Sequence, residues 1–182
     1  MATEVLFIQG GGAHVHDAWD HALVESLSSA LGSAYHVTYP RMPGEADPHY
    51  TAWSSALREE LARLSDGAIL VGHSIGGTML IHTLAEHPPA FTPGALVLIA
   101  APFIGPHGWP SEELPARKDF GAPFRFPVII VHGTNDETAP PKHARQYGET
   151  LPNASLRILD GRDHQLNNDM REVAAAITAL RA

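Results

Sequence analysis

The chain has 182 residues, of which 44% are hydrophobic and 18% are charged, as in an ordinary globular protein with a packed core. Its 12 Lys and Arg residues against 20 Asp and Glu residues give a formal charge of −8, which argues against nucleic acid and anionic membrane surfaces as partners. The chain contains no cysteine, so disulfides, thiolate metal sites and cysteine nucleophiles are excluded.

The length suits one domain, and we expect a single domain over residues 1–182. The first four residues, Met1 to Glu4, carry no basic side chain and so do not resemble the start of a signal peptide. No apolar run approaches the roughly 18 residues that span a membrane. We therefore predict a cytoplasmic protein with no membrane partner.

Short apolar runs alternate with helical patterns along the first half of the chain. The runs predict strands at residues 5–8, 35–39 and 68–71. A helix beginning near Asp17, which we interpret as its N-cap, is expected to end at Gly32. The residues expected to face inward from the first two helices are Trp19, Leu23, Leu27, Ala30 and Leu31, then Trp53, Leu57, Leu61 and Leu64.

The second half repeats this alternation. Strands are predicted at residues 95–100, 128–131 and 155–159. The helices are expected from residue 75 to about His87, over 140–150 with Pro140 and Pro141 in its first turn, and from about Asp169 with Val173, Ile177 and Leu180 facing inward. Strands that alternate with helices imply a parallel sheet covered by helices on both faces, a three-layer α/β sandwich. The continuously apolar runs fit strands that are buried on both sides.

The third of these strands leads into Gly72-x-Ser74-x-Gly76 and then directly into a helix. A turn from strand to helix within about one residue strains the backbone of its central residue and lifts that side chain to the tip of the turn. The amide of Ile75, at the start of the helix, would point at an oxyanion formed there. The pattern predicts a nucleophilic serine at position 74.

A serine hydroxyl becomes a good nucleophile only when a base takes its proton and a carboxylate orients that base. In this architecture the carboxylate and the base follow the serine in that order, on loops after later strands. Asp136 follows the fifth predicted strand and His164 follows the sixth. The carboxyl ends of parallel strands share one edge of a sheet, so Ser74, Asp136 and His164 are expected to meet there.

Three other acids are rivals for the orienting role. Glu137 could stand in for Asp136. Asp160 lies at the end of a strand and Asp163 lies beside the proposed base, and we interpret both as structural. Taken alone, His164 would be interpreted as a surface histidine, one of twelve in the chain, but its order and placement together with Asp136 favour the role of the base.

The oxyanion needs a second amide, expected from the loop after the first strand. Gly10-Gly11-Gly12 supplies it, and we favour Gly11 with Gly12 as the alternative. A dinucleotide site on the same glycines is disfavoured, because Gly-x-Gly-x-x-Gly fails at Val15 and no acid ends the second strand.

Histidines close to this loop could suggest a metal site. The segment from His14 to His21 does not match the His-x-His-x-Asp-His pattern of binuclear hydrolases, so we predict no metal. Gly12 and His14 are instead candidates for substrate binding, and His16 is a further candidate for the pocket rim. His73, also a candidate, is expected to pack beneath the nucleophile rather than to react.

The chain resembles the α/β-hydrolase superfamily over nearly its whole length, and within it the small serine hydrolases of the retinoblastoma-binding-protein-nine type. The resemblance rests on Phe7-Ile8-Gln9-Gly10, Leu70 to Gly76, Leu96 to Ala100, His132 to Asp136, and Asp163-His164. It implies a Ser74–His164–Asp136 triad and a sheet ordered 2-1-3-4-5-6. Gln9 stands where many relatives have His, and Asp163 stands where Gly is common.

Larger relatives insert a cap domain between the fourth and fifth strands, but residues 101–127 are too few for one. This segment carries six large apolar residues: Phe103, Ile104, Trp109, Phe120, Phe124 and Phe126. One interpretation is an apolar lip that receives the substrate, with Phe103 and Trp109 as binding residues. The other is a loop that buries its own aromatic side chains.

The predicted function is that of a serine hydrolase that cleaves an ester or a similar acyl bond of a small molecule through an acyl-enzyme. It needs no cofactor. The alternatives are a catalytically silent binding protein with the same fold and an acyltransferase that uses the same serine. The sequence leaves the substrate and the oligomeric state open.

Overall fold

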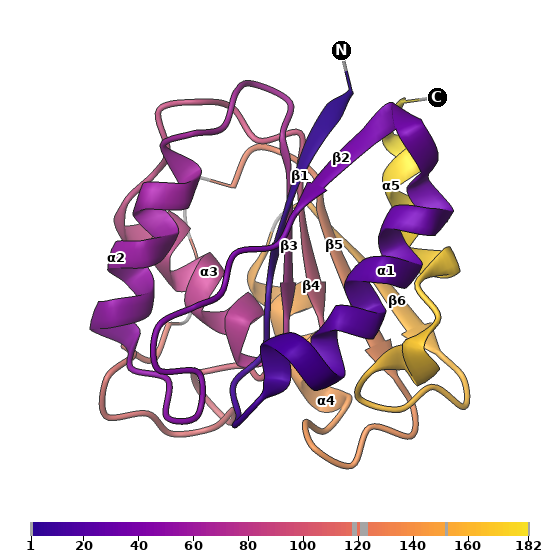
Figure 1. Cartoon of the computed structure of the whole chain (residues 1–182). Coiled ribbons are helices and arrows are strands. Elements are labelled where there is room, and N and C mark those ends of the chain that lie inside the picture. Colours follow the sequence, from indigo (N-terminus) through magenta and orange to yellow (C-terminus); the bar gives the residue numbers. More distant parts are fainter. Residues whose placement is uncertain (1, 118–119, 121–123, 152, 182) are drawn as a thin grey trace.

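The computed structural model describes residues 2–117, 120, 124–151 and 153–181. Its centre is one six-stranded parallel sheet with the strand order β2-β1-β3-β4-β5-β6 (Figure 1). The predicted sheet and its order are therefore confirmed. The strands are β1 (Thr3–Ile8), β2 (Tyr35–Thr38), β3 (Ile69–His73), β4 (Ala95–Ile99), β5 (Val128–Gly133) and β6 (Ala154–Leu159).

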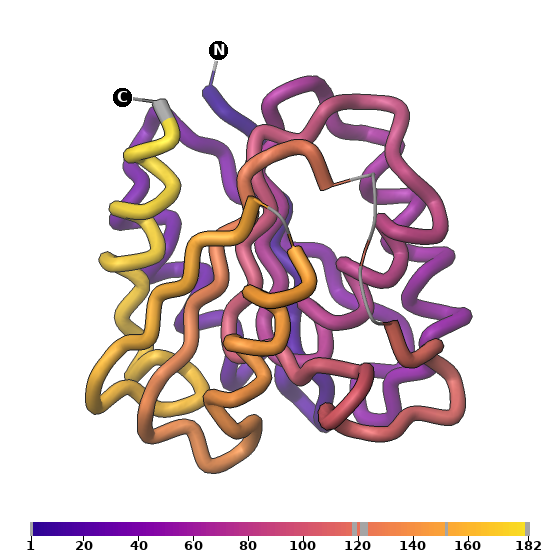
Figure 2. The backbone as a smooth tube through the Cα atoms, turned by 180° about the vertical axis from the view of Figure 1, so that it is seen from behind, coloured from indigo at the N-terminus to yellow at the C-terminus, as the bar shows by residue number. Residues whose placement is uncertain are grey.

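Helices cover both faces of the sheet. Figure 1 shows α2 and α3 on one side and α1 and α5 on the other, and Figure 2 shows the same layers from behind. The α-helices are α1 (Asp20–Leu31), α2 (Tyr50–Leu61), α3 (Ile75–Glu86), α4 (Lys142–Thr150) and α5 (Arg171–Thr178). Short turns are the π-helix η1 (Val15–Trp19) and the 3-10 helices η2 (Gly32–Ala34), η3 (Leu166–Asn168) and η4 (Ala179–Arg181).

The apolar runs of the strands supply both layers of the core, because successive residues of a strand point to opposite faces. In β1, Val5 and Phe7 join a cluster that contains the inner faces of α1 and α5. Leu6 and Ile8 join the cluster beneath α2, α3 and α4. All four side chains are buried, which explains why this strand is apolar at consecutive positions.

Three residues expected to face inward do not: Trp19, Ala30 and Leu180, of which Ala30 lies on the exposed side of α1. Trp19 is 58% exposed, because η1 precedes α1 and the buried stripe of α1 begins at Asp20 and continues through Leu23 and Leu27. Leu180 is 40% exposed, because α5 ends at Thr178 and a 3-10 turn follows.

Helix starts also differ from the expectations. Asp17 is not an N-cap but lies inside η1, which is preceded by His14 in a left-handed conformation. Helix α4 begins after the two prolines, with Pro141 as its N-cap, and α5 begins two residues after Asp169. Within the described part of the chain, no helix combines the length and apolarity needed to cross a membrane.

Candidate active site

Ser74 sits between the end of β3 and the start of α3, with φ 52° and ψ −134°. Backbone this strained is held in place by tight packing on both sides. A Cβ on Gly72 would lie 2.5 Å from the Cα of Gly77, and one on Gly76 would lie 1.9 Å from the carbonyl oxygen of Gln9. The two glycines of the motif are therefore required by the close approach of neighbouring backbone, and the serine stands at the tip of the turn.

Ser74, His164 and Asp136 form a continuous chain of hydrogen bonds. Oγ of Ser74 lies 3.0 Å from Nε2 of His164. Nδ1 of the same imidazole lies 2.8 Å from Oδ2 of Asp136. His164 follows β6 and Asp136 follows β5, so the carboxyl ends of three parallel strands bring together residues that are far apart in sequence.

Asp136 accepts hydrogen bonds at both carboxylate oxygens. Oδ1 accepts the amides of Thr138 and Ala139 at 2.9 and 2.8 Å. Oδ2 accepts His164 and, at 3.0 Å, Nε2 of the buried His132. Burial alone would raise the pKa of Asp136, but the hydrogen bonds from the two histidines outweigh burial and hold that pKa well below the usual carboxyl value. The carboxylate is thus ionised wherever an imidazole could act as a base.

The rival acids occupy other places. The side chain of Glu137 is exposed. Asp160 accepts a hydrogen bond from the hydroxyl of Thr134, and Asp163 accepts one from the amide of Asn167. Among the acidic residues that the structure describes, only Asp136 bonds to the ring of His164.

His73 lies beneath Ser74, as expected, but it has a partner that the sequence analysis missed. Nδ1 of His73 lies 2.9 Å from Oδ2 of Asp20, and its Nε2 lies 3.0 Å from the carbonyl oxygen of His164. The amide of Gly10 donates to the same Asp20 oxygen at 2.7 Å. The one available signal was an aspartate on the apolar stripe of a predicted helix, three residues before Leu23.

The three glycine amides of the loop after β1 differ in their hydrogen-bond partners. The Gly10 amide bonds Asp20, and the Gly12 amide bonds the carbonyl of Glu45 at 2.6 Å. The Gly11 amide between them has no acceptor among the residues that the structure describes. A Cβ on Gly11 would lie 2.9 Å from Cγ2 of Ile75, so the two residues predicted to bind an oxyanion are neighbours.

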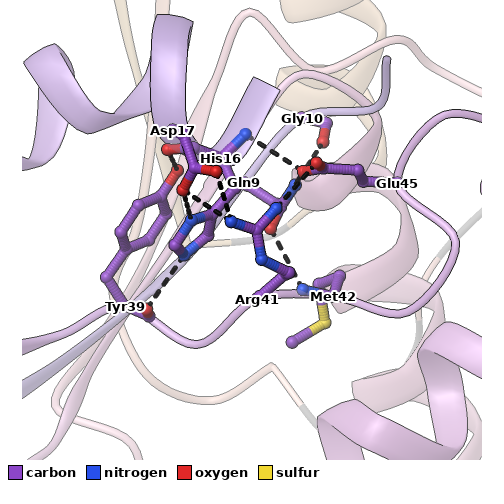
Figure 3. A network of polar contacts seen from close by, with 8 residues as sticks. All are labelled: Gln9, Gly10, His16, Asp17, Tyr39, Arg41, Met42 and Glu45. Carbon is purple, nitrogen blue, oxygen red and sulfur yellow. Dashed lines mark hydrogen bonds and ion pairs between the residues drawn. The ribbon is translucent and has the colours of Figure 1, made fainter. Parts of the chain in front are cut away.

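A network of hydrogen bonds and ion pairs centred on Glu45 holds the glycine loop in place (Figure 3). Oε2 of Glu45 accepts Nε2 of Gln9 at 2.6 Å and the amide of His16 at 3.1 Å. Oε1 of Gln9 accepts the amide of Met42 at 3.0 Å. Arg41 donates to Oε1 of Glu45 at 2.8 Å. Gln9 thus has both polar ends occupied, and its role is to tie the glycine loop to residues 41–45.

The same network anchors η1. Arg41 also pairs with Asp17, and the imidazole of His16 stacks on the ring of Tyr39 with centroids 4.1 Å apart (Figure 3). The hydroxyl of Tyr39 donates to the carbonyl of His16 at 2.9 Å. His16 is therefore held against the sheet edge, whereas His14 is exposed. Among the described residues, no group of three or more potential ligands is arranged to hold a metal ion.

A cavity of about 340 Å³ opens at Ser74. It includes the predicted residues Gly11, His73 and His164, but the structure places Gly12, His14, Phe103 and Trp109 outside its lining. Sequence reasoning missed the walls formed by η1 and by the loops after β5 and β6. The lining residues are Gly10, Gly11, Val15, Trp19, Asp20, His73, Ser74, Thr138, His164 and Gln165.

The aromatic residues of segment 101–127 mostly enter the core. Phe103, Phe120, Phe124 and Phe126 are buried in the cluster beneath α2, α3 and α4. The ring of Phe103 packs edge-on against Tyr147 of α4. Of the two interpretations of this segment, burial of its own aromatic side chains is the one that the described residues follow; part of it, residues 118–119 and 121–123, lies outside them.

Solved structures with the same fold cover almost the whole chain. A serine hydrolase involved in carbazole degradation, the CarC enzyme, aligns with a TM-score of 0.76 at 15% identity, over 99% of this chain and 91% of that one. Est1E from Butyrivibrio proteoclasticus aligns with a TM-score of 0.71 at 18% identity, over 99% and 87%. Mouse alpha/beta hydrolase domain-containing protein 10 aligns with a TM-score of 0.71 at 17% identity, over 98% and 88%.

These identities are low enough that the three structures speak for the fold alone. Among curated protein sequences, none matches this chain. A family model described as serine hydrolase matches residues 6–169, which include the Gly72-x-Ser74-x-Gly76 turn, Asp136 and His164. The chain therefore belongs to the serine hydrolase family, and its fold is that of a compact α/β-hydrolase.

Proposed function

We propose that the protein hydrolyses a carboxylic ester of a small molecule, with Ser74 as nucleophile, His164 as base and Asp136 as the residue that orients the base. The observation that carries this proposal is the hydrogen-bonded chain from Oγ of Ser74 through both ring nitrogens of His164 to Asp136. Because Asp136 accepts from Nδ1, the imidazole presents an unprotonated Nε2 to the serine hydroxyl.

In the first half of the reaction, Oγ of Ser74 attacks the ester carbonyl carbon while its proton passes to Nε2 of His164. The negative charge that develops on the carbonyl oxygen is stabilised by the amides of Gly11 and Ile75. Collapse of this intermediate breaks the bond to the alcohol oxygen, which takes the proton from His164. The products of this half are a free alcohol and an acyl group on Ser74.

In the second half, His164 takes a proton from water, and the hydroxide attacks the acyl carbon. The second tetrahedral intermediate uses the same two amides. Its collapse returns the proton to Oγ of Ser74 and releases the carboxylic acid. No group beyond the chain's own residues and water is needed to balance either half.

A fluorophosphonate, which phosphonylates activated serines with loss of fluoride, tests the proposal directly. We expect one adduct per chain in intact-mass spectrometry, located on the peptide that contains Ser74, and none after heat denaturation. The absence of an adduct on folded protein would contradict the proposal and favour a binding protein with this fold. Product analysis in the presence of added alcohols would distinguish hydrolysis from acyl transfer.

The cavity walls favour a neutral substrate with an apolar group. The ionisable residues in its lining are Asp20, His73 and His164, and each is hydrogen-bonded to a partner within the site, so nothing at the mouth would attract an ionic group. Trp19 presents a 58% exposed ring there, beside Val15. An exposed indole at the mouth of a cavity is well suited to pack against an aromatic or branched alkyl group.

Trp19→Ala is expected to lower kcat/KM for a phenyl-bearing ester by roughly fivefold, because about 1 kcal/mol of aromatic packing is lost. The rate with an acetyl ester of the same leaving group should change little. Trp109→Ala is the matched comparison, since Trp109 is also exposed but packs against His143 outside the cavity. Equal effects of both substitutions on both esters would contradict a role for Trp19 in substrate binding.

A further inference from the structure

A second histidine–carboxylate pair lies beneath Ser74, outside the chain of hydrogen bonds that ends at Asp136. Asp20 is the first residue of α1 and His73 is the last residue of β3. Both side chains are almost fully buried, and Nδ1 of His73 lies 2.9 Å from Oδ2 of Asp20. The reaction steps derived above make no use of this pair.

With Asp20 ionised, as its lowered pKa indicates, the partners of His73 require a proton on each of its ring nitrogens. Nε2 faces the carbonyl oxygen of His164 at 3.0 Å, and a carbonyl can only accept. Nδ1 faces a carboxylate oxygen of Asp20, which is also an acceptor. A proton on the other oxygen of Asp20 would have no acceptor among the described residues. His73 is therefore doubly protonated and neutralised by the carboxylate of Asp20.

The electrostatics agree with this protonation state. Burial alone would lower the pKa of His73, but the charge and the hydrogen bond of Asp20, together with the hydrogen bond to the carbonyl of His164, outweigh burial and raise that pKa above its ordinary value. Burial would raise the pKa of Asp20, but the charge and the hydrogen bond of His73 bring it below the usual carboxyl value. Each partner thus favours the charged form of the other.

The pair connects two loops that the proposed reaction needs. Through Nε2, His73 holds the backbone carbonyl of His164, the proposed base. Through Oδ2, Asp20 holds the amide of Gly10 at 2.7 Å, next to Gly11, the proposed oxyanion donor. One buried ion pair therefore bonds to the backbone on both sides of Ser74.

We propose that Asp20 and His73 are positioning residues, which hold the base and the oxyanion-stabilising amide in register around Ser74. The inference rests on the proposed function, because it concerns the alignment of groups that act in that reaction. Alignment of this kind matters strongly, since a displacement of about 1 Å costs roughly 100-fold in rate. Loss of the pair should therefore lower kcat rather than raise KM.

Two amide substitutions at His73 separate the two halves of the link. The side-chain amide of asparagine reaches the place of Nδ1, so His73→Asn keeps a donor for Asp20 and loses the donor for the His164 carbonyl. The amide of glutamine reaches the place of Nε2, so His73→Gln keeps the donor for His164. We expect kcat to fall roughly 100-fold in His73→Asn and roughly tenfold or less in His73→Gln, with KM nearly unchanged in both.

Asp20→Asn tests the opposite end of the pair. An amide oxygen in the place of Oδ2 would still accept the hydrogen bond from Gly10. His73 would then either carry a buried positive charge without a counter-ion, or lose the proton on Nε2 and with it the hydrogen bond to the carbonyl of His164. Either result loosens the loop of the base. We expect kcat to fall roughly 10- to 100-fold, again with little change in KM.

Rates should be expressed per active site, counted by fluorophosphonate labelling, so that unfolded protein does not enter the comparison. His82→Asn is the matched control: His82 is a fully buried histidine of α3 whose ring packs against Tyr50 and Phe120. Its substitution should lower the thermal midpoint and leave kcat per active site within about twofold, since it touches neither loop.

The outcomes separate this inference from the proposed function. A wild type that is neither labelled nor active would contradict the function itself. An active wild type with unchanged kcat in His73→Asn and Asp20→Asn would overturn the inference alone. If these variants do not fold, ¹⁵N spectra of the wild type still test the inference, because a His73 without a proton on Nε2 at neutral pH could not hold the carbonyl of His164.

Discussion

Replacement of Ser74 by alanine is expected to abolish ester turnover, with a loss on the order of 10⁶-fold in kcat, as when the nucleophile of a triad is removed. The methyl group keeps the Cβ but has no Oγ to attack the carbonyl or to bond Nε2 of His164. Turnover of an activated aryl ester, followed by absorbance of the released phenol, measures the loss. The same variant should form no adduct with a fluorophosphonate.

The fold should survive this substitution. Serine and alanine both carry a Cβ, so the strained backbone at φ 52° is equally costly with either residue. Ser54→Ala is the matched control, since Ser54 is a buried serine of α2 outside the cavity lining, and its turnover should equal that of the wild type. Turnover in Ser74→Ala within tenfold of the wild type would contradict the assignment of the nucleophile.

The sheet could be predicted because its information is local. Each central strand is a short, continuously apolar run, as in Val5 to Ile8, and each is bounded by glycine, proline or a polar turn. The strand-to-helix turn at Ser74 could be predicted for a similar reason. Position 76 lies so close to the backbone of Gln9 that only glycine fits there, so the turn has a recognisable sequence pattern. The partners of Ser74 followed from chain order along a parallel sheet.

Contacts between segments that are distant in sequence could not be predicted in the same way, because they have no local sequence pattern. Asp20 resembles a surface residue at the start of a helix, and only the three-dimensional register of α1 turns it toward His73. Trp19, just before α1, lies at the cavity mouth, whereas the helical pattern of the sequence predicted that it would be in the core. Phe103 illustrates the reverse error, because an aromatic residue in a loop is equally compatible with a substrate lip and with the core that it enters.

The support of the glycine loop was likewise hidden. Gln9 differs from the residue common in relatives, but the sequence does not reveal that Glu45, 36 positions later, accepts its side-chain amide. A carboxylate in a proline-rich loop has no periodic pattern that would distinguish it from a solvated one. The role of Glu45 depends on where its loop packs, and this is set by the tertiary structure rather than by the local sequence.

Asp136→Asn is the second substitution with a large expected effect, a fall in kcat of about 10⁴-fold. Oδ1 must remain an oxygen to accept the amides of Thr138 and Ala139, so the new NH₂ group takes the place of Oδ2. It then faces Nδ1 of His164 as a donor and favours the tautomer with the proton on Nε2. That nitrogen cannot take the proton of Ser74.

Glu137→Gln is the control, because Glu137 is the neighbouring acid but is exposed, and its kcat should stay within about twofold of the wild type. A larger loss in Glu137→Gln than in Asp136→Asn would transfer the orienting role to Glu137. The comparison is informative because both substitutions remove one charge from the same loop. A difference in kcat then reports hydrogen bonding to His164 rather than general electrostatics.

Stability should respond to the same substitution in a pH-dependent way. The pKa of Asp136 is lowered in the folded state, so its ionisation stabilises the fold above the unfolded-state value of about 3.9 and ceases to do so as the pH falls toward the folded-state value. The wild type should therefore exceed Asp136→Asn in the free energy of unfolding at pH 7, and the gap should narrow in acid. A gap that widens as the pH falls would mean that the paired carboxylate is not the ionised acceptor on which the orientation of His164 depends.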